Sequence, residues 1–154
     1  MIQVRAAPVR AFSRDFELSD GSAGIGEARL AMLPSRAVIK LRGAEYSVDR
    51  IGLLRPEFEL RRGGATVYRL VPSGFMRYRV EGLDRTVFMR AAGPFWRHYV
   101  LEHGDRGLAT LRPERLFGRA ALVDFEESIP EAAAAFLLIT SILLWRRRAR
   151  RARS

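Results

Sequence analysis

The segment that most constrains how this chain can fold is the apolar run SIPEAAAAFLLITSILLWRRR, residues 128–148, near the C-terminus. At about 100° per residue, its large side chains spread over every direction around a helix. Thr140 and Ser141 form no coherent polar face, and each hydroxyl can return a hydrogen bond to the backbone one turn earlier. A helix that is apolar on all sides must be surrounded by protein or by lipid.

Several observations favour protein as the surroundings. The uninterrupted apolar run, residues 132–145, covers about 21 Å as a helix, whereas a bilayer core is about 30 Å thick and usually takes about 20 residues. A tail anchor would also carry the arginines that follow across the membrane, against the positive-inside bias. Trp145 followed by arginines is nevertheless typical of a membrane boundary, so a C-terminal tail anchor is the alternative.

The start of the helix has its own signal. Ser128, Pro130 and Glu131 match a capping box with proline in the first turn. Acidic residues lie near the positive end of the helix dipole, and arginines follow its negative end. We therefore expect a helix over residues 129–145.

The chain before this helix has the pattern of a sheet. Apolar and polar residues alternate in short segments between residues 16 and 125, as in AVIKLRG, FELRRGG, FMRYRVEG and TVFMRAAG. Glycine and proline turns recur about every 8–12 residues, which is typical of an antiparallel sandwich or barrel. Nine or ten strands can be counted. The predicted fold is mainly β: an antiparallel β-barrel of short strands closed around one hydrophobic C-terminal α-helix.

The predicted organisation is a single domain with two appendages. Residues 1–15 are expected to be a loose N-terminal leader, residues 16–145 the barrel with central helix 129–145, and residues 146–154 a basic tail. The chain has no cysteine, which excludes disulfides and thiolate metal sites. The N-terminus lacks the apolar core of a secretory signal. We expect a cytoplasmic protein, peripheral at the inner face of the membrane.

Four stretches resemble a known family: FELSDGSAGIGEARL, YSVDR, FELRRGG and RAALVDFEESIPEAAAAFLLITSILLW. Over about residues 16–145 the chain resembles the tubby C-terminal-like superfamily, which includes tubby domains, phospholipid scramblases and LURP-one-related proteins. It is most similar to small bacterial LURP-one-related proteins. The resemblance implies a twelve-stranded barrel around a hydrophobic helix and an association with phosphoinositide or phospholipid membranes. It implies no ligand residues.

The charge of the chain is concentrated at its end. The formal net charge is +10, and removing the six tail arginines leaves +4. These candidate contacts for anionic lipid are Arg146, Arg147, Arg148, Arg150, Arg151 and Arg153. Near an anionic membrane each arginine contributes about 1 kcal/mol. The same residues can contact nucleic-acid phosphates, a partner we rank below a phospholipid surface, or simply form a solvated extension.

No motif in the sequence predicts catalysis. The glycines of GSAGIG lack the order and the lysine of a phosphate loop and indicate a hairpin. In HYVLEH, His98 and Glu102 share a strand face while His103 points away, so the three do not converge on a metal. We expect a non-enzymatic binding or accessory protein without cofactor. An enzyme or small-ligand carrier is a further alternative, and a carrier would show an apolar cavity beside the helix.

Overall fold

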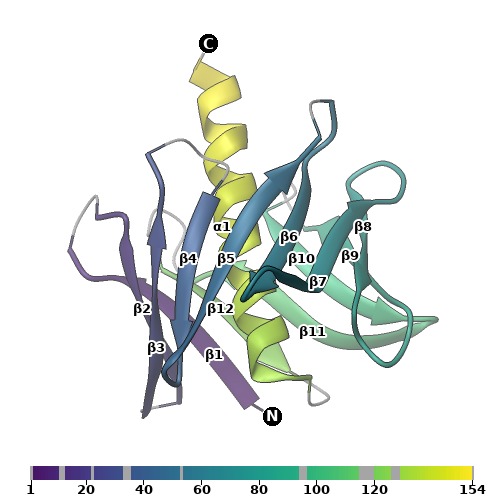
Figure 1. Ribbon diagram of the computed structural model, residues 1–154. Coiled ribbons are helices and arrows are strands. Elements are labelled where there is room, and N and C mark those ends of the chain that lie inside the picture. Colours follow the sequence, from purple (N-terminus) through teal and green to yellow (C-terminus); the bar gives the residue numbers. More distant parts are fainter. Residues whose placement is uncertain are drawn as a thin grey trace.

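The strands of this protein each pair with their neighbours in the chain, and the first pairs with the last. The computed structural model describes residues 2–10, 13–21, 23–32, 36–52, 54–93, 97–114, 120–125 and 129–153. All pairings are antiparallel, and the pairing of β1 with β12 closes the barrel (Figure 1). The elements are β1 (Ile2–Pro8), β2 (Asp15–Asp20), β3 (Ala23–Leu30), β4 (Arg36–Leu41), β5 (Ala44–Ile51), β6 (Glu57–Arg62), β7 (Ala65–Pro72), β8 (Arg77–Glu81), β9 (Val87–Ala92), β10 (His98–His103), β11 (Arg106–Pro113), β12 (Ala121–Phe125) and α1 (Glu131–Arg153).

The alternation in the sequence places one face of each strand inside the barrel. In β4, Ala37, Ile39 and Leu41 are buried, while the residues between them are exposed. The same rule holds in β6 and β9. The inward residues there are Phe58, Leu60, Val87, Met89 and Ala91. The predicted barrel fold is confirmed.

The interior of the barrel is filled by α1, which runs along its length (Figure 1). Its residues from Ala133 to Leu144 are all buried. Thr140 donates to the carbonyl of Phe136 at 2.9 Å, and Ser141 donates to that of Leu137 at 2.7 Å. Both buried hydroxyl groups therefore have hydrogen-bond partners within the helix. The surface that α1 presents to the strands is apolar.

The N-terminal segment is not the loose leader that the sequence predicted. Ile2–Pro8 form β1, which pairs with β12 on one side and β2 on the other. The alternation in IQVRAAP is short and rich in alanine, so it is a weak local signal. Without β1, one edge of β2 and one edge of β12 would remain unpaired. A barrel closes only when every strand edge is paired, so these two edges bind β1.

Two further expectations need correction. The barrel has twelve strands, more than the nine or ten counted from the sequence. The helix also continues to Arg153, well beyond Trp145, because alanine and arginine are good helix formers and cations favour the negative end of the helix dipole. Ser128 of the predicted capping box lies outside the described residues.

The helix gives the barrel two different ends. At one end Glu131, the first residue of α1, accepts hydrogen bonds from Arg42 at 2.7 and 3.1 Å. At the other end Arg150 donates to the carbonyl oxygen of Met32 at 3.4 Å. We call the end where α1 leaves the barrel the exit end, and the end with Glu131 the opposite end.

The glycine-rich stretch forms the hairpin that was expected. β2 and β3 pair through it, with Gly21 in the turn at φ +61°. Gly26 lies so close to β4 that a Cβ there would meet the carbonyl oxygen of Lys40. Gly21 therefore allows the turn, and Gly26 allows the close approach of β3 to β4.

The role of β1 can be tested with one substitution at two positions. Val4 points into the barrel and is buried, whereas Val9 is half-exposed just after β1. Val4→Asp should lower the free energy of unfolding by several kcal/mol or prevent folding, because an unpaired carboxylate would be buried. Val9→Asp should change it by about 0.5 kcal/mol or less. Equal effects in denaturant unfolding would contradict the pairing of β1.

Candidate functional site

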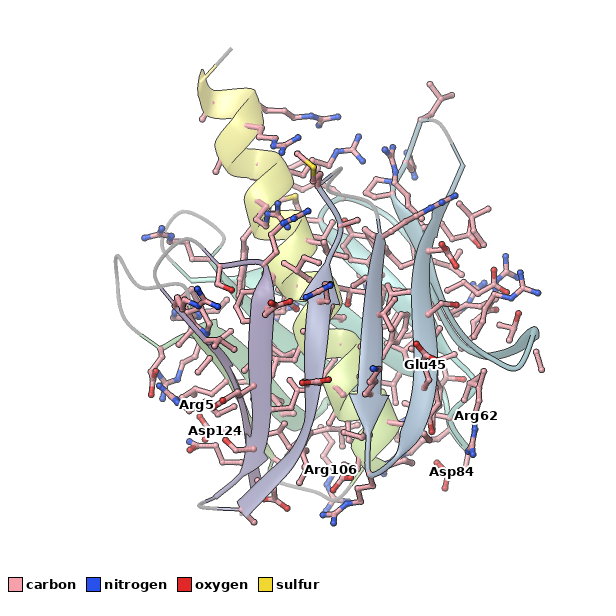
Figure 2. All side chains as sticks on the ribbon, turned by 60° about the vertical axis from the view of Figure 1, so that its left-hand side comes forward. Arg5, Glu45, Arg62, Asp84, Arg106 and Asp124 are labelled. Carbon is pink, nitrogen blue, oxygen red and sulfur yellow. The ribbon has the colours of Figure 1, made fainter. Side chains whose placement is uncertain are left out.

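The exit end carries the arginines that the sequence singled out. All six lie on the last turns of α1, of which residues 146–153 extend roughly 12 Å beyond Trp145. Arg146, Arg147 and Arg148 are half-buried at the barrel mouth, whereas Arg150 and Arg151 are exposed. The side chain of Arg153 lies outside the described residues. Figure 2 shows nitrogen-tipped side chains around the emerging helix, and the labelled Arg62, Asp84 and Arg106 far from it.

Arg148 is fixed to the barrel by an aromatic residue. Its guanidinium donates to the hydroxyl of Tyr99 at 2.7 Å and lies 5.4 Å from the centre of the Tyr99 ring. The ring of Trp145 stacks on Tyr99 with 6.0 Å between centroids. These contacts attach the base of the arginine-rich segment to the barrel wall.

Arg147 lies among other cations. Burial lowers the pKa of its guanidinium, and the nearby Arg50 and Arg151 lower that pKa further. One of its nitrogens, Nη1, is buried without a hydrogen-bond partner in the described part of the chain. Like charges in close proximity repel each other, so an anion bound at this point would relieve that repulsion.

Most strand arginines do not add to this charge, because acidic neighbours neutralise them. Arg36 pairs with Asp49 at 3.3 Å, and Arg90 pairs with Glu102 at 2.7 Å. Other pairs on the outer surface are Arg5–Glu114, Arg29–Asp15, Arg79–Glu81 and Arg112–Asp124. Arg77 lies over the ring of Phe88 at 3.8 Å. The positive excess is therefore concentrated on the helix.

The exit end also exposes apolar side chains, which the sequence analysis missed. Five large hydrophobic residues of the described chain are solvent-exposed: Leu54 (93% exposed), Phe75 (83%), Met32 (74%), Val9 and Val38. The first four lie in the connections β5–β6, β7–β8, β3–β4 and β1–β2, all at this end. Val38 is near the start of β4. We call Val9, Met32, Leu54 and Phe75 the apolar tips.

A signal for the apolar tips was present in the sequence. Leu54 and Phe75 each lie within three residues of a glycine and a proline, which predicts a turn, and turn residues are usually polar. Turn position alone does not say which end of a barrel a residue occupies. Strand order and direction supply that information, and they place all four tips at the end of the barrel where the arginine-rich helix emerges.

Two surface hollows help to locate the site. A hollow of about 330 Å³ lies between the β5–β6 and β7–β8 connections and is lined by Arg55, Phe75 and Arg77. A larger one, about 680 Å³, lies on the outer face of β1–β4, where charges of both signs, such as Glu17 and Lys40, line it. The first combines apolar surface with positive charge, and it lies at the exit end.

The side chains of the segment HYVLEH, residues 98–103, do not converge on a common site. Glu102 binds Arg90, and Nδ1 of His103 lies 2.7 Å from the carbonyl oxygen of Thr86. The described residues contain no group of three or more His, Asp or Glu side chains that could hold a metal ion.

Among the described residues, no helix combines the length and the apolar character needed to cross a bilayer.

The chain matches no protein-family model, no curated protein and no solved structure. The resemblance to the tubby-like superfamily therefore stays a prediction.

The burial of Tyr99 at the exit end can be tested through pH. Burial is the main cause that raises the pKa of the Tyr99 hydroxyl above its usual value of 10.0. Because the folded protein then retains this proton when the unfolded chain loses it, the free energy of unfolding should fall as pH rises above about 10.

Tyr99→Phe should lower the free energy of unfolding at pH 8 by about 1 kcal/mol, because Arg148 loses a hydrogen bond that water can partly replace. It should also make the fall above pH 10 less steep, by up to about 1.4 kcal/mol per pH unit. Urea unfolding from pH 8 to 11 measures both effects. An unchanged slope would mean that Tyr99 does not keep its proton in the fold.

Proposed function

We propose that the protein is a non-enzymatic binding or accessory protein whose exit end docks onto an anionic phospholipid membrane. The observation that carries this proposal is the coincidence of the arginine-rich helix and the four apolar tips at one end of the barrel. Membrane-surface proteins combine these two features, because anionic head groups attract the cations and the acyl region accepts the apolar side chains. The natural place for such a protein is the inner face of the cytoplasmic membrane.

The two features have separate roles in this proposal. Arg150 and Arg151 are exposed on the part of α1 that leaves the barrel, so they meet the head groups first. Leu54 and Phe75 lie on connections at the rim and enter the interface once the protein is held there. Apolar tips distinguish a lipid surface from nucleic acid, which would be contacted mainly through its phosphates. The family resemblance points in the same direction.

Binding to vesicles tests the electrostatic part. The protein should bind phosphatidylcholine vesicles that contain phosphatidylglycerol, and bind pure phosphatidylcholine vesicles much less. Arg150→Gln/Arg151→Gln should weaken binding about 30-fold, at about 1 kcal/mol for each arginine. High salt should weaken the wild type as well, since 1 M salt shortens the Debye length to about 3 Å.

The matched control is Arg61→Gln/Arg62→Gln, which removes two exposed arginines at the opposite end. It should bind as the wild type does. A second variant, Leu54→Ser/Phe75→Ser, should weaken binding while leaving the unfolding transition in place. If both arginine pairs had the same effect, or if a DNA duplex bound more tightly than the vesicles, the proposed docking face would be wrong.

A further inference from the structure

A cleft of about 400 Å³ opens between α1 and the barrel rim at the exit end. Phe16 of β2, Pro113 of β11 and Ala120 before β12 contribute its barrel side. Ile142 and Trp145 contribute the base of its helix side. The volume is within the range of small-molecule sites, about 300–1,000 Å³.

The helix sequence explains why there is a cleft at this point. Ile142, Trp145, Ala149 and Ala152 are spaced so that they follow one face of a helix. In the described part of the segment after Trp145, the residues that are not arginine are these two alanines, and both line the cleft. Small side chains leave space where an arginine would fill it.

The cleft also has polar groups at suitable places. Arg97, Arg146 and Arg148 line it and give it positive charge, with no acidic residue among the lining residues. An apolar wall flanked by cations is complementary to a hydrocarbon chain that ends in an anion.

We propose that this cleft binds one molecule of a single-chain anionic lipid, with the alkyl chain against Phe16, Ile142 and Trp145 and the head group at the arginines. This inference rests on the proposed function, since the membrane at the exit end supplies the lipid. Inside the barrel, Leu137, Leu138 and their described neighbours are buried around α1. The proposed lipid site therefore lies at the mouth, beside the exposed turns of α1.

The test is calorimetric titration of the full-length protein with dodecyl phosphate below its micelle concentration, without vesicles. One molecule should bind per chain. Ala149→Trp, which fills the cleft, should raise the dissociation constant at least tenfold. Ala65→Trp places the same side chain at an exposed alanine of β7 at the opposite end and should leave the constant unchanged. Ala152→Trp provides a second filled cleft in case Ala149→Trp does not fold.

The head group and the chain are tested separately. Dodecyltrimethylammonium should bind at least tenfold more weakly than dodecyl phosphate, and inorganic phosphate alone should not compete at equal concentration. Equal affinity of the filled-cleft and wild-type proteins would overturn the proposal, as would equal affinity for the two head groups. A wild type that binds anionic vesicles but not dodecyl phosphate would overturn the cleft site alone, whereas failure on vesicles would overturn the docking face.

Discussion

Enclosure of an all-round apolar helix is the constraint on which the rest of the structure depends. Residues 133–144 of α1 have no face that tolerates water, and the strands have no other apolar layer to cover. An open sheet would cover only part of such a helix. A closed barrel covers all of it, and in closing it also removes every free strand edge. The need to enclose α1 thus explains both the closed topology and the pairing of β1 with β2 and β12.

The same helix also makes the barrel asymmetric. Its first residue is fixed by Arg42, and its last turns project from the other end with their arginines. The strands balance most of their own charge through neighbouring pairs such as Arg90–Glu102. A chain with a modestly charged body therefore has one strongly basic end. The apolar tips and the cleft beside Trp145 lie at that end too, so positive charge and exposed apolar surface occur together there.

The sequence predicted the features that depend on local patterns. Alternation identified the buried faces of β4, β6 and β9, and the uniform apolarity of α1 predicted that it would be enclosed. Features that depend on long-range pairing were missed. Val4 is buried because of strand partners more than a hundred residues away in β12, and the apolar tips come together only through strand order. The cleft depends on how far α1 projects beyond the rim, which hydrophobic periodicity does not indicate.

The most direct measurement of the central claim compares two shortened chains. A chain ending at Trp145 keeps the buried part of α1 and should give a soluble, β-rich protein with a cooperative unfolding transition. A chain ending at Phe125 keeps all twelve strands but lacks the helix, and it should aggregate or show no cooperative transition in circular dichroism. If the chain ending at Phe125 unfolds cooperatively from a soluble barrel, the strands have an interior of their own and the account is wrong.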